Sequence, residues 1–140
     1  MNKFYINLDD SVERKTKFDN TWTRWSATGR NQVDILTRKK MISYYNVSEA
    51  YHLGKCGCFL SHIKLLKYIV ENKLIGTYQV AEALLNELLS NKRYRAIDIM
   101  YINSKLNKQY LYPALFVEER VDSTIRKGKR KYSNEYYNLN

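Results

Sequence analysis

The sequence predicts an α/β domain. Two short runs rich in β-branched and aromatic residues, 3–8 (KFYINL) and 21–27 (TWTRWSA), predict strands. Two longer segments, 53–72 and 78–90, repeat apolar residues with a helical period and predict helices that face a core. The chain has 140 residues, which is enough for one domain with a hydrophobic core but not comfortably for two.

The chain is strongly basic, with a formal net charge of +10 and a pI of about 9.6. Such a charge favours nucleic acid, anionic membrane surfaces or phosphorylated ligands as partners. No apolar run is long enough to cross a bilayer, and acidic residues occupy the place where a signal peptide needs its apolar stretch. We therefore expect a cytoplasmic protein, with association to a membrane surface as a further option.

The first predicted strand is followed by a polar turn. Asp9 and Asp10 end the strand, and Asp10 with Glu13 three residues later matches a capping box. This pattern predicts a helix that continues to about Asn20.

The same turn supplies candidate ligand contacts. In open α/β sheets, ligands bind beyond the carboxyl ends of the strands. Asn7, Asp9 and Arg14 lie at or just after such an end and are candidates. The alternative is that the acidic residues cap the helix and Arg14 is solvated.

The region after the second strand is polar and basic. Thr28 and Gly29 end the strand, and residues 30–40 predict a loop with a helix start near Thr37. Ser48 matches the cap of a short helix that leads towards residue 51.

Segment 53–72 combines glycines with a core helix. Gly54 and Gly57 come first, and the polar pair Ser61 and His62 follows in the first turns of the helical pattern. Glycines let a backbone approach a ligand closely, and a helix start offers free N–H groups to an anion. The segment is therefore a candidate wall of a site. The alternative is a loop and a buried helix with a hydrogen-bonded histidine.

The remaining elements carry weaker signals. Residues 96–102 are apolar apart from Asp98, and this pattern fits either a strand or a helix. Residues 109–117 (QYLYPALFV) predict a strand, and Pro113 places it at an edge or a bend. We expect the folded domain to span 1–125.

Two catalytic or metal-binding arrangements have weaker support from the sequence. His52, Cys56, Cys58 and His62 are zinc-type ligands, but zinc sites usually close from two separate pieces of chain. A nucleophile pair of Cys58 and His62 has helical spacing, but no third residue that would orient the histidine is identified. The two cysteines are too close in sequence for a relaxed disulfide.

The C-terminal residues 126–140 form a basic tail that we expect to be loosely ordered. Five cations are followed by Tyr132, Tyr136 and Tyr137, a combination that suits stacking and charge neutralisation of single-stranded nucleic acid. A small basic binding module for nucleic acid or anionic surfaces is therefore the alternative function. The plainer interpretation is a solvated tail.

Several blocks resemble one family. Residues 4–15 (FYINLDDSVERK) are similar to the opening of family 25 glycosyltransferases, the lipopolysaccharide-biosynthesis type. Residues 53–62 (LGKCGCFLSH) resemble the family's Gly-x-x-Gly-Cys-x-x-Ser-His segment, which precedes a long helix. Weaker similarity, in the same order along the chain, is found at 24–30, 111–116 and 123–125.

The resemblance implies a GT-A-like, Rossmann-like fold that binds a nucleotide-sugar. A UDP-sugar is the expected donor, and a glycan or lipid-linked molecule is the expected acceptor. The positions that match the family's motifs would bind the donor; they are Asn7, Asp9, Arg14, Gly54, Gly57, Ser61 and His62.

The sequence departs from the family's pattern in its centre. The family's long helix leads to a strand that ends in acidic residues, and an Asp-x-Asp-like element further on holds a divalent ion, manganese or magnesium. Here segment 53–72 runs almost directly into 78–90, and no Asp-x-Asp is present. Asp98 is a weak candidate for a downstream acid, and we identify no metal ligand. We therefore expect a truncated, weakly active or inactive domain, whose apolar helix faces are covered by a homo-oligomer or a partner chain.

Overall fold

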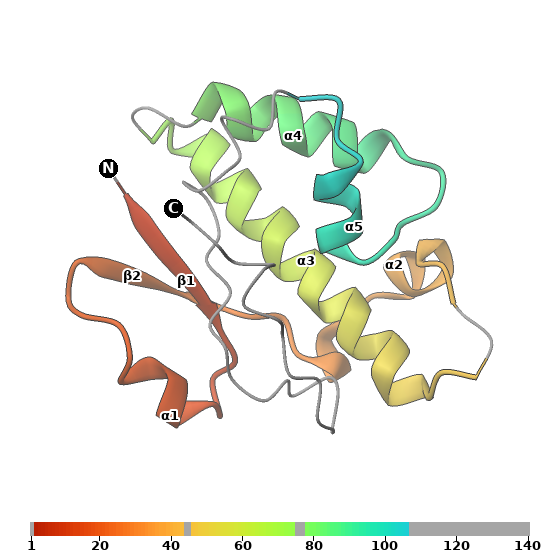
Figure 1. The fold of residues 1–140 in the computed structure, drawn as a ribbon, viewed down its shortest axis with the longest axis horizontal. Coiled ribbons are helices and arrows are strands. Elements are labelled where there is room, and N and C mark those ends of the chain that lie inside the picture. The colour runs from red at the N-terminus through yellow and green to blue at the C-terminus, as the bar shows by residue number, and fades with distance from the viewer. Residues whose placement is uncertain (1, 44–45, 75–77, 107–140) are drawn as a thin grey trace.

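The computed structural model of the protein describes residues 2–43, 46–74 and 78–106. The predicted strand at 109–117 and the basic tail at 126–140 lie outside these residues. Figure 1 shows the long helix α3 in the middle, with the two strands on one side and α4 and α5 on the other. The elements in chain order are β1 (Lys3–Asn7), α1 (Val12–Lys15), β2 (Trp22–Ser26), η1 (Arg30–Gln32), α2 (Ile35–Lys40), α3 (Glu49–Glu71), α4 (Tyr78–Ser90) and α5 (Ile97–Ile102).

The strands β1 and β2 form a two-stranded parallel sheet. The register pairs Lys3 with Trp22 at one end and Asn7 with Ser26 at the other. Both predicted strands are therefore confirmed, and their carboxyl ends lie next to each other. The mixed α/β composition is observed, whereas the finer GT-A-like assignment stays a prediction.

The helix predicted from Asp10 to about Asn20 is much shorter than expected, because α1 covers Val12–Lys15 only. Side chains form hydrogen bonds with nearby backbone carbonyl and amide groups, and such bonds compete with continuation of the helix. The Thr16 hydroxyl donates to the Glu13 carbonyl at 2.7 Å, and the Asp19 carboxylate accepts from the Thr21 amide at 2.8 Å.

Aromatic side chains pack against both faces of the sheet. Trp25 lies 5.1 Å from Tyr68 of α3, measured between ring centroids. Trp22 instead lies 5.2 Å from Phe18, which stacks on Tyr5 at 4.2 Å. The odd spacing of the two tryptophans places them on opposite faces of the strand.

The helix α3 starts earlier than the sequence indicated. Ser48 is its N-cap and accepts a hydrogen bond from the Tyr51 amide at 3.1 Å. Gly54 and Gly57 therefore lie inside the helix and are buried, so the predicted glycine-rich loop is wrong. The free N–H groups of the helix start belong to the residues after Ser48. Burial of the apolar side of α3 outweighs the helix propensity lost at each glycine, about 1 kcal/mol.

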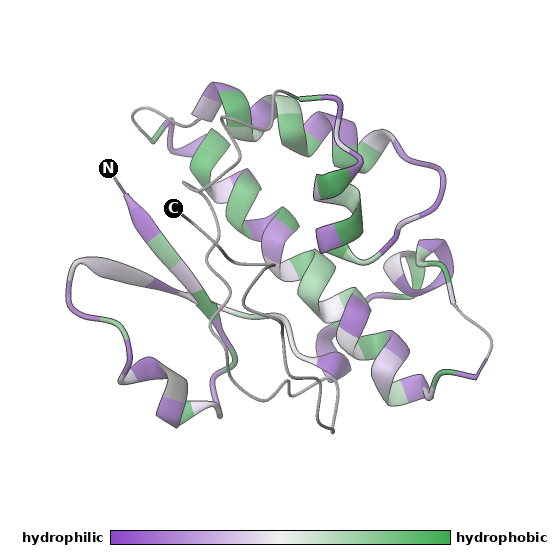
Figure 2. Ribbon diagram, viewed as in Figure 1, coloured by the Kyte–Doolittle hydropathy of each residue, from purple (hydrophilic) through white to green (hydrophobic). Residues whose placement is uncertain are grey.

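The hydrophobic core lies between α3, α4 and α5, where Figure 2 shows most of the hydrophobic colour. The segment 96–102, which fitted strand or helix, contains the helix α5. No helix among the described residues is long and apolar enough to cross a membrane. Fully or almost fully buried side chains from α3 and α4 include Cys56, Phe59, Leu65, Leu66, Leu84 and Leu88.

The short helix α2 begins before Thr37, the start suggested by the sequence. Asp34 is its N-cap, and the Asp34 carboxylate accepts from both the amide and the hydroxyl of Thr37 at 2.7 Å. The sequence patterns did not predict this cap, although Asp is among the residues favoured at a helix N-cap.

The helix α3 approaches the loop after β2 most closely at Gly57. A Cβ atom added at Gly57 would lie 2.6 Å from the Thr28 carbonyl oxygen, which is inside van der Waals contact. The Thr28 amide donates to the Ser61 hydroxyl at 2.8 Å, and this hydroxyl donates to the Gly57 carbonyl at 2.7 Å. Glycine at this position therefore lets the helix pack directly against the backbone of the loop after β2.

Replacing Gly57 with alanine is expected to destabilise the fold. The added methyl group meets backbone atoms, so overpacking of about 1–3 kcal/mol outweighs the helix-propensity gain of about 1 kcal/mol. Urea unfolding followed by circular dichroism measures the difference. Lys67→Ala, on an exposed turn of the same helix, is the control and is expected to change the free energy of unfolding by less than about 0.5 kcal/mol. A Gly57→Ala protein as stable as the parent would show that this contact is not tight.

Candidate functional site

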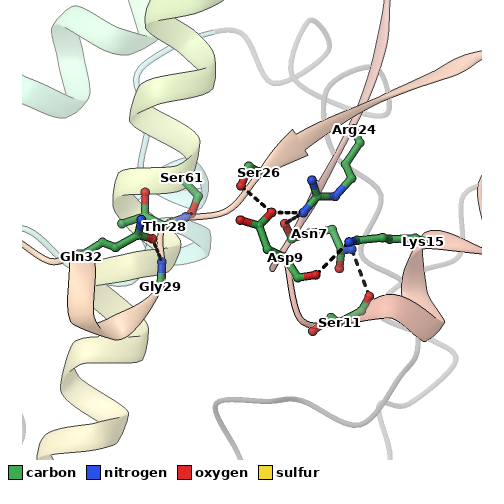
Figure 3. Close-up of polar contacts among 10 residues, drawn as sticks. All are labelled: Asn7, Asp9, Ser11, Lys15, Arg24, Ser26, Thr28, Gly29, Gln32 and Ser61. Carbon is green, nitrogen blue, oxygen red and sulfur yellow. Dashed lines mark hydrogen bonds and ion pairs between the residues drawn. The ribbon is translucent and has the colours of Figure 1, made fainter.

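Polar side chains gather at the carboxyl ends of β1 and β2 (Figure 3). We call Asn7, Asp9, Lys15, Arg24 and Ser26 the strand-end cluster. Parallel pairing of the two strands brings their polar ends together, because the register aligns Asn7 with Ser26. This is the edge of an open sheet at which ligands usually bind.

Asp9 connects the two strand ends. Its carboxylate forms an ion pair with Arg24 and accepts a hydrogen bond from the Ser26 hydroxyl at 2.8 Å. The Arg24 hydrogen bond, and then the Ser26 hydrogen bond, lower the pKa of Asp9. Asp9 therefore stays ionised and orients the guanidinium group, although its own side chain is largely exposed.

Two buried polar atoms of the cluster have no hydrogen-bond partner. Asn7 is 3% exposed, and its amide nitrogen donates to the Ser11 carbonyl at 3.1 Å, whereas its Oδ1 atom is unpaired. The Nε atom of Arg24 is unpaired as well, while its Nη2 donates to the Asn7 carbonyl at 3.2 Å. Buried polar groups are nearly always paired, so this acceptor and this donor have unmet hydrogen-bonding capacity at the strand ends.

A second cation borders the cluster. The Lys15 ammonium group donates to the Asp9 carbonyl at 2.8 Å. Arg14, another residue predicted to bind the donor, is the neighbour of Lys15 in α1. Sequence analysis named Asn7, Asp9 and Arg14 but missed Lys15, Arg24 and Ser26. The available signal was the alternation of Arg24 and Ser26 with apolar Trp25, which places both on one face at the end of a strand.

Gly57 and Ser61, predicted to line the donor site, are used in packing. Both form the contact between α3 and Thr28 described above, and Lys64 adds a hydrogen bond to the Thr28 hydroxyl at 3.0 Å. Gly54 is buried inside α3. These three candidates therefore lie in the helix next to the loop after β2 rather than in a glycine-rich ligand loop.

His62 lies against α5. Its Nδ1 atom is 2.8 Å from the Tyr101 hydroxyl. Burial lowers the pKa of His62 to about 4 and raises the pKa of Tyr101, so both groups are neutral at pH 7. Since α5 packs on the side of α3 away from the sheet (Figure 1), the structure separates His62 from Ser61, its neighbour in sequence.

Asp98 does not join the strand-end cluster. It lies in the first turn of α5, and its exposed carboxylate accepts from the Ile99 amide at 2.8 Å. This arrangement fits an acid in the first turn of a helix, where it interacts favourably with the dipole.

The two histidines of α3 have different hydrogen-bond partners. His52 is buried, with Nε2 3.2 Å from the Arg38 carbonyl, and burial raises the pKa of the Cys56 thiol. Among the described residues, no group of three or more His, Cys, Asp or Glu side chains lies together as a metal site would require. Asp9, the carboxylate at the strand ends, is held by Arg24 and Ser26. The described residues therefore do not fit the divalent ion that the resemblance implies.

No protein-family model, curated protein or solved structure matches the chain. The resemblance to family 25 glycosyltransferases therefore stays a prediction from the motifs in the sequence.

Desolvation of the half-buried His62 side chain makes stability depend on pH. Below its ordinary pKa of 6.5, His62 binds a proton in the unfolded chain, but in the folded chain it does so only near pH 4. The free energy of unfolding therefore decreases as the pH falls from 7 to 4, and His62 contributes about 1–3 kcal/mol of this decrease. His62→Gln is expected to flatten the profile by that amount, measured by urea unfolding across the range. Parallel profiles for parent and variant would contradict a neutral, desolvated His62.

Proposed function

We propose that the strand-end cluster binds the phosphate groups of a nucleotide-sugar, and that the chain is a shortened relative of family 25 glycosyltransferases. A UDP-sugar is the expected ligand, with a glycan or lipid-linked acceptor. The observation that carries this proposal is the pair of buried, unpaired atoms, Asn7 Oδ1 and Arg24 Nε, at the carboxyl ends of two parallel strands.

The chemistry of the cluster suits a phosphorylated ligand. A guanidinium group offers several N–H donors in a planar arrangement that matches phosphate oxygens, and Lys15 adds a second positive charge nearby. Asn7 Oδ1 is a hydrogen-bond acceptor suited to a hydroxyl or N–H group of the nucleoside. Asp9 orients Arg24 before the ligand arrives, and the phosphate then competes with this carboxylate for the guanidinium group.

We propose further that the protein is weakly active or inactive as a transferase. In the family the departing diphosphate is neutralised by a divalent ion, and the sequence contains no Asp-x-Asp to hold one. Asp98 lies in α5 and His62 contacts Tyr101 of α5, so neither of these remaining candidates interacts with the strand ends. We therefore assign no catalytic residue.

Calorimetric titration with UDP and a UDP-sugar, with and without manganese, tests the proposal. We expect binding that does not require manganese. Arg24→Ala is expected to weaken it about 10- to 100-fold, because charge-assisted hydrogen bonds to phosphate are lost. Asp9→Asn is expected to strengthen it, since the competing carboxylate charge is removed while the asparagine carbonyl oxygen can still accept hydrogen bonds from Arg24 and Ser26 and keep the guanidinium group oriented.

Lys67→Ala, at an exposed position of α3, is the matched control for loss of one positive charge. Failure of a folded sample to bind UDP or the UDP-sugar would disprove the proposed function. Turnover of the donor that is lost on substituting Asp98 or His62 would contradict the weakly active or inactive assignment.

A deletion distinguishes nucleotide-sugar binding from the alternative function, which is binding of nucleic acid by the basic tail. Removing residues 126–140 is expected to leave UDP binding unchanged. Affinity for single-stranded nucleic acid that vanishes with the tail and falls steeply with salt would instead favour the binding-module interpretation.

A further inference from the structure

The helix α2 and the turn at 91–95, far apart in sequence, lie side by side. An isolated parallel bridge pairs Met41 with Tyr94. The Ile42 amide donates to the Tyr94 carbonyl and the Tyr94 amide to the Lys40 carbonyl, each at 2.8 Å. These backbone hydrogen bonds fix the two basic segments relative to each other, on the side of α3 away from the sheet (Figure 1).

Positive charge from both segments gathers there. The Lys40 ammonium group lies 4.3 Å from the centroid of the Tyr94 ring, and Arg93 Nε donates to the Lys40 carbonyl at 3.3 Å. Two acids are close by, but Asp34 caps α2 and Glu49 pairs with Arg38. The turn is coloured hydrophilic in Figure 2. The six cations are Arg38, Lys39, Lys40, Lys92, Arg93 and Arg95.

The same helix exposes two large aliphatic side chains. Ile35 is 72% exposed and Leu36 is 67% exposed, and among the described residues no other large hydrophobic side chain is as exposed. Ile35 precedes Lys39 by four residues, and Leu36 precedes Lys40 by four, so each aliphatic side chain neighbours a cation along the helix. An exposed apolar pair next to a cluster of cations is typical of segments that insert shallowly into anionic bilayers.

We propose that Ile35, Leu36 and the six cations form a membrane-binding face for a bilayer containing anionic phospholipids. The cations interact with the headgroups, and the two aliphatic side chains enter the boundary between headgroups and acyl chains. A nucleic acid satisfies the charge equally well but offers no apolar region for Ile35 and Leu36. The face is separate from the strand-end cluster, so the proposal does not depend on nucleotide binding.

Co-sedimentation of the full chain with vesicles tests the proposal. We expect binding to phosphatidylcholine vesicles that contain about 30% phosphatidylglycerol and little binding to phosphatidylcholine alone. The double variant Ile35→Ser with Leu36→Ser is expected to weaken binding about tenfold or more, since it removes the two aliphatic side chains that would enter the bilayer. Lys39→Glu with Arg93→Glu is expected to weaken it at least as much, and the parent's binding should fall as salt rises from about 0.1 M to about 0.5 M.

Matched controls are available elsewhere on the chain. Val12→Ser with Ile102→Ser removes aliphatic side chains that are 63% and 60% exposed on other helices. Lys67→Glu with Lys73→Glu makes the same change in net charge at the other end of α3. Both controls are expected to bind like the parent, and circular dichroism checks that all variants are folded.

Three outcomes would overturn the proposal. In the first, the parent does not bind anionic vesicles. In the second, the Lys39/Arg93 variant binds as the parent does, which would exclude these cations and leave the basic tail. In the third, the Ile35/Leu36 variant binds as the parent does and a single-stranded oligonucleotide displaces the chain from vesicles. The last result would identify nucleic acid as the partner of the basic segments.

Discussion

The contact between α3 and the loop after β2 determines how the two halves of the protein are joined. The absence of a side chain at Gly57 lets the helix approach the Thr28 carbonyl, and the Ser61 hydroxyl both accepts from Thr28 and donates back to the helix. A two-stranded sheet is at best marginal alone in water, so the strands depend on this helix for a surface to pack against. Phe4 and Trp25 meet that surface at Tyr68.

This contact also limits which residues are available to a ligand. Gly57 and Ser61 suggested a phosphate-binding segment in the sequence. In the structure both residues pack α3 against the loop after β2. Among the described residues, buried side-chain atoms without a hydrogen-bond partner are found on the sheet, at Asn7, Arg24 and Trp25, and at His52 near the start of α3. The candidate site is therefore formed by strand pairing and by the orientation that Asp9 imposes on Arg24. The helix α3 packs against the opposite face of the sheet.

Local patterns predicted most of the elements, because strand composition and helical periodicity are properties of adjacent residues. The strands, the core side of α3 and the helix α4 followed from such patterns. The extent of α3 did not, because burial rather than propensity keeps Gly54 and Gly57 helical. Asn7 and Asp9 were predictable from their place after a strand, whereas the role of Arg24 depends on its partner across the strand pair. The separation of Ser61 from His62 depends on where α5 packs.

The bridge between α2 and the turn after α4 has a consequence for the order of folding. Lys40 and Tyr94 are 54 positions apart, whereas the parallel strand pair and the α3–α4 pair connect neighbouring segments. Closing a long loop costs more conformational entropy than joining adjacent elements, so the bridge is expected to form late. Once formed, the bridge is held by core packing, because Met41 and Tyr94 are buried and the Tyr94 ring stacks on Phe59, so its amides are expected to exchange slowly.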